Sequence, residues 1–163
     1  MKMIIDTDMA FDDCAAIFYL LNHSQVEVIG ITVAGTGEVH SRPGVENACQ
    51  LLHIAERTAE NIVVTGGDDE PMDGYHAFPA EWRRKVDGFF NRPKLYPATH
   101  VLDQHAVDYL VDTLSRKEKI SLLALGPLTN IAEALEWDPG IKQNIEKIVI
   151  MGGAVKVPGN LII

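Results

Sequence analysis

The sequence predicts an α/β fold: an open, mostly parallel, Rossmann-like sheet with helices on both faces. Short runs rich in Val and Ile alternate with longer stretches whose apolar residues recur at helical spacing. Such alternation is typical of parallel strands joined by crossover helices. The 163 residues suffice for one core, and no linker or internal repeat divides them, so we expect a single domain over residues 1–163.

The elements follow from local patterns along the chain. Five short β-branched segments predict strands, at residues 3–5, 26–33, 62–64, 120–125 and 148–151. Four longer segments predict helices, at residues 12–21, 45–55, 99–114 and 127–137. Thr99 is a natural N-cap for the third helix, and Pro127 suits the first turn of the fourth. Residues 65–97 are rich in Gly, Pro and Asp and predict a long irregular lid or binding loop.

Charge and composition exclude several classes of protein. The net charge of −9 argues against binding to nucleic-acid phosphates or to an anionic membrane surface. No apolar run approaches the roughly 20 residues of a membrane helix, and Asp6 interrupts the first apolar residues before a signal sequence could form. Cys14 and Cys49 lie in helix-like stretches and are expected to be reduced packing residues rather than a disulfide or a catalytic thiol. We therefore expect a cytoplasmic protein.

Polar and glycine-rich clusters follow every predicted strand. They occupy residues 6–13, 35–40, 66–69, 126–127 and 152–160. In an open parallel sheet, ligands bind at the carboxyl ends of the strands. These clusters therefore predict a site along that edge of the sheet.

The first cluster holds four carboxylates, Asp6, Asp8, Asp12 and Asp13. Asp12 and Asp13 open a helix, where a capping role is ordinary, but such a role does not account for Asp6 and Asp8. Strand alternation points Asp6 and Asp8 to the same side, and two carboxylates about 4 Å apart repel by about 4 kcal/mol at an effective dielectric constant near 20. A proton or a cation must relieve this repulsion, and a pure carboxylate set favours Ca²⁺ or Mg²⁺ over zinc.

Three motifs carry a family resemblance. They are Asp6-Thr7-Asp8 with Asp12-Asp13, then Ala-Leu-Gly-Pro-Leu-Thr-Asn at 124–130, and Met-Gly-Gly-Ala at 151–154. In this order they resemble the inosine–uridine nucleoside hydrolase family, over essentially the whole chain but only the family's amino-terminal half. The resemblance implies a Ca²⁺-dependent enzyme that cleaves the N-glycosidic bond of purine or pyrimidine ribonucleosides, giving ribose and free base. It also implies a homo-oligomer.

The resemblance also implies roles for the acidic residues. Asp8 would bind Ca²⁺ and take the proton of the attacking water, so it is the expected catalytic residue. Asp13 would be a bidentate Ca²⁺ ligand, and Leu125 would give its backbone carbonyl to the ion. Asp6 would support these ligands from behind.

The substrate-binding residues implied in the same way are Asp12, which would hold the ribose hydroxyls, with Met151 and Asn160 lining the ribose pocket. Thr36 stands near the position where the family commonly has a sugar-binding Asn, and it lacks the two donors of an amide. Met9-Ala10 replaces the family's usual Pro-Gly, and Ala10 suits that turn only if no positive φ is needed.

The family's later Glu-x-Asn segment, a His and a further metal-binding Asp have no counterpart in these 163 residues. We therefore expect the chain alone to be a poor nucleosidase that associates with another copy or with a carboxyl-terminal half. Two alternatives stay open: a non-catalytic homologue that binds Ca²⁺ or ribose, and a haloacid-dehalogenase-like phosphohydrolase with Asp6 as nucleophile and Mg²⁺. The second fits poorly, because the last strand ends in Gly152-Gly153 rather than in an acidic pair.

Histidines and aromatic residues add weaker candidates. The six histidines show no metal-ligand spacing, and His40 and His76 are the best placed to face a substrate. Phe78 and Trp82 lie in the long loop and are candidates for stacking on a nucleobase or for anchoring the loop. Nothing in the sequence specifies which base is preferred.

Overall fold

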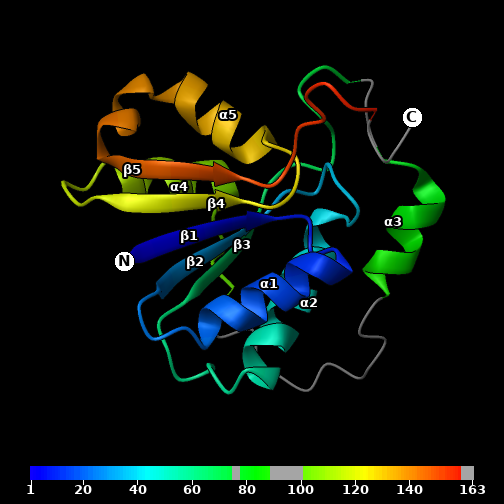
Figure 1. Ribbon diagram of the computed structural model, residues 1–163, viewed down its shortest axis with the longest axis horizontal. Coiled ribbons are helices and arrows are strands. Elements are labelled where there is room, and N and C mark those ends of the chain that lie inside the picture. Colours follow the sequence, from blue (N-terminus) through cyan, green and yellow to red (C-terminus); the bar gives the residue numbers. More distant parts are fainter. Residues whose placement is uncertain (75–77, 89–100, 159–163) are drawn as a thin grey trace.

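A computed structural model describes residues 1–74, 78–88 and 101–158 (Figure 1). Its centre is a five-stranded parallel sheet with the strand order β3-β2-β1-β4-β5. The strands are β1 Lys2–Thr7, β2 Glu27–Val33, β3 Val63–Gly66, β4 Ile120–Ala124 and β5 Ile145–Ile150. The helices are α1 Phe11–Leu21, α2 Ser41–Ile54, α3 Ala80–Asp87, α4 Ala106–Leu114 and α5 Thr129–Trp137, with a 3₁₀ turn at Pro139–Asn144. The predicted fold class is confirmed.

Each face of the sheet carries its own apolar core. Alternate side chains of β1 serve the two cores: Met3 and Ile5 pack on the α1 and α2 side, whereas Ile4 packs on the α4 and α5 side. Figure 1 shows these two helix pairs on opposite faces of the sheet. Since side chains of a strand alternate between faces, strands buried on both sides read as continuous apolar runs, as the sequence does here.

The central strand β1 marks the point where the order of the strands reverses. From β1 the chain first builds outward through β2 to β3, and it then crosses back to place β4 on the other side of β1. The chain therefore leaves β1 and β4 toward helices on opposite faces of the sheet, and ligands of doubly wound folds bind at the carboxyl ends of the strands at such a point. The acidic cluster of residues 6–13 lies there.

The outer strand β5 is much more exposed than the interior strands. Ile148, Val149 and Ile150 are 37%, 45% and 51% exposed, although all three are apolar. In the described part of the chain, no strand pairs with the outer edge of β5. The sheet thus presents an apolar edge beyond its fifth strand.

The third predicted helix begins later than expected. Thr99 lies outside the described residues, and α4 starts at Ala106 with His105 as its N-cap. Residues 101 and 102 pair with β3 instead: Val101 forms an isolated bridge with Val64, and Leu102 donates its N–H to the Val64 carbonyl at 2.9 Å. Tertiary pairing overrides the helical spacing at this point.

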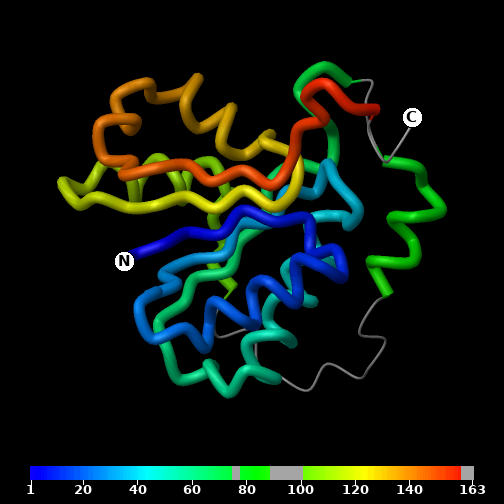
Figure 2. Tube along the Cα trace, viewed as in Figure 1, coloured from blue at the N-terminus to red at the C-terminus, as the bar shows by residue number. Residues whose placement is uncertain are grey.

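The predicted irregular segment 65–97 contains a helix, α3. Figure 2 follows the chain as it leaves the sheet after β3, forms α3 away from the sheet, and returns at α4. Among the other bounds, α2 begins at Ser41 rather than at residue 45, with Pro43 in its first turn, where a missing N–H costs nothing. The last strand covers Ile145–Ile150 rather than 148–151. No helix in the described ranges has the length and apolarity that crossing a bilayer would demand.

Candidate active site

Three of the four predicted carboxylates are buried together at the carboxyl end of β1. Asp6 is the second-last residue of β1, Asp8 directly follows the strand, and Asp13 lies in the first turn of α1; they are 1%, 5% and 0% exposed. Asp12 is exposed beside them. A cluster of buried carboxylates is costly unless protons, donors or cations compensate it, so each partner matters.

Asp6 accepts hydrogen bonds from neutral donors of β2 and of α5. Its Oδ1 accepts from Thr32 Oγ1 of β2 and, at 2.8 Å, from Asn130 Nδ2 of α5. No donor reaches Oδ2, and burial raises the pKa of Asp6 to about 7. The Asp6 carbonyl also accepts the Leu125 N–H at 2.8 Å. Asp6 therefore joins β1 to β2, to β4 and to α5.

Asp8 sits where only glycines leave room for it. Its Oδ2 accepts the Glu38 N–H at 2.9 Å. A Cβ atom at Gly37 would collide with this same oxygen, and one at Gly126 would lie 2.8 Å from the Asp8 nitrogen. The glycines after β2 and β4 thus form the two walls that hold the Asp8 side chain in place.

Asp13 forms the close carboxylate pair with Asp8. Thr7 Oγ1 donates to Asp13 Oδ2 at 2.5 Å, whereas no donor reaches the buried Oδ1. The two carboxyl groups lie within hydrogen-bonding reach, and burial together with the charge of Asp8 raises the pKa of Asp13 to about 8. Burial also raises the pKa of Asp8. Asp8 is thus paired most closely with Asp13, whereas strand alternation predicts its closest pair to be Asp6; the charge of Asp8 also raises the pKa of Asp6.

The turn after β1 explains this difference. Alternation applies only as far as Thr7, where β1 ends. Met9 then adopts φ 54°, a left-handed conformation that L-residues rarely take, while its N–H donates to Thr7 Oγ1 at 2.9 Å. Ala10 has φ −61°, so it needs no glycine. The unusual residue of this turn is Met9, which proline could not replace because its ring fixes φ near −65°.

The donors here suit a hard divalent cation. Asp8 and Asp13 offer carboxylate oxygens, including the unpaired Asp13 Oδ1. Leu125 directly follows β4, and its neighbour Gly126 touches Asp8. Within the described ranges, no three Asp, Glu, His or Cys side chains converge closely enough to hold a metal by themselves. Because Ca²⁺ takes 6–8 oxygen ligands, carbonyl, water or substrate oxygens would have to complete such a set.

The predicted substrate-binding residues differ in accessibility. Asp12 is exposed, and Met151 is 49% exposed after β5, with its N–H bonded to the Ala124 carbonyl at 2.8 Å. Thr36 is 2% exposed, and its hydroxyl pairs with that of Thr129 at 2.9 Å. Asn160 lies outside the described residues. Thr36 thus ties the loop after β2 to the start of α5, a contact that the sequence did not indicate.

The remaining sequence candidates mostly have structural partners. His40 pairs through Nδ1 with Asp87 of α3 at 2.7 Å, and His76 lies outside the described residues. Trp82 is 42% exposed on α3. Cys14 and Cys49 are free thiols, and burial raises their pKa values to about 12 and about 11. Neither is poised to act as a nucleophile, which agrees with the packing role predicted for both.

Two residues that hold the site in place, Asn130 and Arg83, were not predicted from the sequence. Asn130 is fully buried and donates to Asp6, and it could have been found from its place in the 124–130 motif. Arg83, 7% exposed on α3, donates to the Gly35 and Val39 carbonyls beside the site. No local pattern identifies Arg83, since Gly35 and Val39 lie more than 40 residues away in the sequence.

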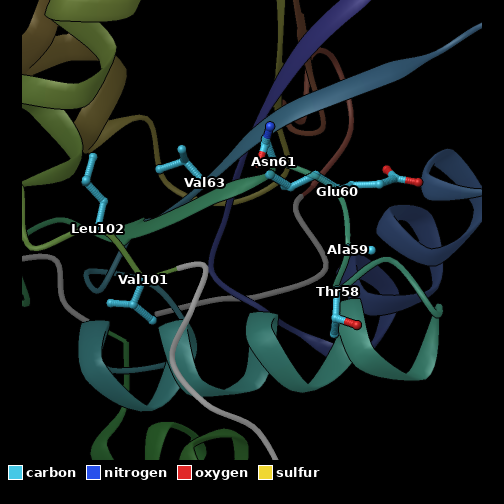
Figure 3. A pocket seen from close by; sticks show the side chains of 8 residues that line it. Thr58, Ala59, Glu60, Asn61, Val63, Val101 and Leu102 are labelled. Carbon is cyan, nitrogen blue, oxygen red and sulfur yellow. The ribbon is translucent and has the colours of Figure 1, made fainter.

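A separate hollow of about 300 Å³ lies elsewhere (Figure 3). Asn61 and Val63 line it at the amino end of β3, together with Val101 and Leu102. Glu60 also lines it and is paired with Arg57 at 2.6 Å. This hollow is at the opposite end of the strands from the acidic cluster, so it does not belong to the candidate site.

The fold and the site together define a doubly wound α/β protein with a buried acidic centre at its switch point. Residues 3–162 match the family model described as "Inosine-uridine preferring nucleoside hydrolase". The chain belongs to this family, as its motifs indicated.

Known proteins agree with this assignment. The chain is 34% identical over 162 residues to a "Probable uridine nucleosidase 1" of Oryza sativa, covering 98% of this chain and 49% of that protein. It is 32% identical to the "Pyrimidine-specific ribonucleoside hydrolase RihB" of Escherichia coli, covering 94% and 48%. Its structure resembles the plant nucleoside hydrolase PpNRh1, with a TM-score of 0.84, 37% identity and coverage of 98% and 50%. The chain thus spans about half the length of the curated relatives that it matches.

Proposed function

We propose that this chain supplies the cation- and ribose-binding part of a Ca²⁺-dependent ribonucleoside hydrolase. The observation that carries the proposal is the buried Asp8–Asp13 pair at the carboxyl end of β1, with an unpaired oxygen on Asp13. Family membership supports the reaction class and argues against a phosphohydrolase built on Asp6. A cytoplasmic location and self-association are further predictions from the sequence.

The residues of the chain suit hydrolysis of an N-glycosidic bond. A bound Ca²⁺ would lower the pKa of water and orient it. Asp8 would accept the proton of the attacking water, a role that a carboxylate within hydrogen-bonding reach of that water can fill. Asp12, exposed at the mouth of the site, would accept hydrogen bonds from the ribose hydroxyls and orient the sugar. The acidic surroundings would stabilise the positive charge that develops on the ribose as the bond breaks.

The base of the nucleoside is left open by the proposal. Relatives carry names that specify uridine or pyrimidines, whereas a structural neighbour at 30% identity is titled a purine-preferring hydrolase. The names of these proteins share nucleoside hydrolysis and differ in the base. Asp8 and Asp12 would act on the water and the ribose rather than on the base, so both uridine and inosine belong in the test.

The test measures base release from uridine and from inosine by a full-length parent of this chain, with Ca²⁺ and with chelator, because the 163 residues alone are expected to turn over poorly. Asp8→Asn should lower kcat by about 10²–10⁴, the usual effect of losing a general base, while ribose binding changes little. A variant that keeps turnover within about tenfold would show that Asp8 is not the base.

The non-catalytic alternative gives a different result in the same experiment. In that case Ca²⁺ would raise the melting temperature of the chain through Asp13, as a bound ligand does, but neither nucleoside would be cleaved. Asp13→Ala should remove the Ca²⁺-dependent shift under either alternative. If the wild-type protein shows no shift, the cation site itself is refuted.

A further inference from the structure

Arg83 is a buried cation on a helix whose other basic residues are exposed. Its side chain is 9% exposed, whereas Glu81, Arg84 and Lys85 on the same helix are exposed. Burying a guanidinium costs several kcal/mol unless its donors are satisfied. The position of Arg83 therefore reflects specific partners rather than the general surface of α3.

The partners of Arg83 are backbone carbonyls of two loops at the carboxyl edge of the sheet. Nη2 donates to the carbonyls of Gly35 and Val39, the second at 3.4 Å, and Nη1 donates to the Asp69 carbonyl at 3.4 Å. The Asp69 carboxylate also lies 3.7 Å from Nη2 and caps α2 by accepting the Ser41 N–H at 2.6 Å. Arg83 thus binds both ends of residues 35–39, which we call the 35–39 turn.

The 35–39 turn is the part of the protein that touches Asp8 from the β2 side. Within it, Glu38 donates its N–H to Asp8 Oδ2, and Gly37 packs against the same side chain. A shift of the turn by a few tenths of an ångström would change both contacts. Arg83 therefore reaches Asp8 through one intervening turn of backbone.

Other contacts fix the helix that carries Arg83. Asp87 accepts the His40 N–H at 2.8 Å and pairs with the His40 ring, and Asn47 Nδ2 donates to the Val86 carbonyl at 3.1 Å. These contacts hold the end of α3 against the start of α2. The guanidinium is therefore presented to the 35–39 turn from a fixed support.

We propose that Arg83 is a positioning residue for the cation site: by holding both ends of the 35–39 turn, it sets the place of the Glu38 N–H and of Gly37 against Asp8. The planar guanidinium has donors for several carbonyls at once, which a lysine ammonium on a flexible stem does not match. The inference rests on the proposed function, since the ion concerned is the one assigned to Asp8 and Asp13. If Arg83 acts in this way, cation affinity depends on α3, although none of the predicted cation ligands lies on that helix.

The test compares Arg83→Gln with Arg84→Gln, which makes the same change of charge at the exposed neighbouring position. Ca²⁺ is titrated by calorimetry into chelator-stripped protein. We expect Kd to rise about 10- to 100-fold for Arg83→Gln, the usual effect of removing a group that orients a metal ligand, and to change less than about twofold for Arg84→Gln. The Kd of Arg83→Lys should lie between those of the two glutamine variants, because lysine keeps the positive charge but lacks the several planar N–H donors of the guanidinium.

A second measurement separates positioning from general stability and covers a variant that folds poorly. Hydrogen–deuterium exchange of the 35–39 turn, without Ca²⁺, should be faster in Arg83→Gln than in Arg84→Gln, and Arg83→Lys serves if Arg83→Gln is unfolded. Equal Ca²⁺ affinity in both glutamine variants would overturn the proposal. If the wild-type protein binds no Ca²⁺, the proposed cation site fails, and exchange alone then decides: equal exchange in both variants overturns the positioning role, and faster exchange in Arg83→Gln supports it.

Discussion

Replacing Asn130 with aspartate tests how the buried carboxylates are held. The change preserves shape but replaces the amide that donates to Asp6 Oδ1 at 2.8 Å with an acid. Position 130 is fully buried, so an ionised carboxylate there is costly even below about pH 7, where Asp6 holds its proton; above that pH the two charges at this separation would also repel by about 6 kcal/mol at an effective dielectric constant near 20. Keeping a proton on the new carboxyl instead costs about 1.4 kcal/mol per pH unit above its ordinary pKa, about 1.5 kcal/mol at pH 5 and about 5.5 kcal/mol at pH 8. The smaller cost applies at each pH, so the loss of stability should grow steadily with pH.

The assay is urea unfolding followed by far-UV circular dichroism, with chelator, at pH 5, 6, 7 and 8. The difference in unfolding free energy between wild type and Asn130→Asp should increase by about 1.4 kcal/mol per pH unit. The series keeps this slope measurable even if the variant is unfolded at pH 8, because a domain of this size is stable by only about 5–15 kcal/mol. Asn130→Ala, which loses the hydrogen bond without adding an acid, should show a weaker pH dependence. A loss for Asn130→Asp that is the same at pH 5 and pH 8 would refute the reasoning.

Three further predictions concern the same site. Without Ca²⁺, the raised pKa values of Asp6 and Asp13, about 7 and about 8, mean that the native state binds more protons than the unfolded state. As far as these groups contribute, stability should therefore be greatest below about pH 4 and should fall progressively as pH rises from about 4 through 7–8. Melting temperatures that do not fall over this whole range in chelator would contradict the burial of both acids. Gly37→Ala should displace Asp8 and weaken Ca²⁺ binding at least about tenfold, whereas Gly88→Ala, whose Cβ would meet nothing closer than 3.8 Å, should leave it unchanged in the same titration. Met9→Pro should lower the unfolding free energy by about 3 kcal/mol or more, because proline cannot take φ 54° and lacks the N–H that is bonded to Thr7. Met9→Leu should lower it by less than about 1.5 kcal/mol. Similar urea midpoints for the two variants would show that the turn does not need its left-handed residue.

The fold could be predicted because the sequence patterns that specify it are local and recur along the chain. Apolar runs of β-branched residues mark strands that are buried on both faces, and the polar residues at their ends mark the binding edge of the sheet. The presence of Asp6, Asp8 and Asp13 at the centre of the site followed from these two patterns. The roles assigned to these three residues, and those of Asp12, Met151 and Leu125, remain predictions.

What could not be predicted depends on contacts between distant segments. The left-handed turn at Met9 redirects the chain after β1 and pairs Asp8 with Asp13, which alternation along a strand cannot show. The helix α3 has little apolar surface, and its anchors, such as Arg83 on Gly35 and Asn47 on Val86, span dozens of residues. Residues 101 and 102 have helical spacing, yet β3 recruits their backbone. In each case a tertiary partner decides the conformation.

The position of β1 between β2 and β4 has a consequence for the order of folding. The β1–α1–β2 unit can close through a short stretch of chain, whereas β4 must return over more than 100 residues, as the Asp6–Asn130 bond spans 124 positions. Long loops close late because their entropy must be lost before their contacts form. We therefore expect the wall made by Gly126 to reach Asp8 late in folding, after the transition state. Contacts that form after the transition state slow unfolding rather than speed folding, so a cation bound at Asp8 would act chiefly by lengthening the lifetime of the native state.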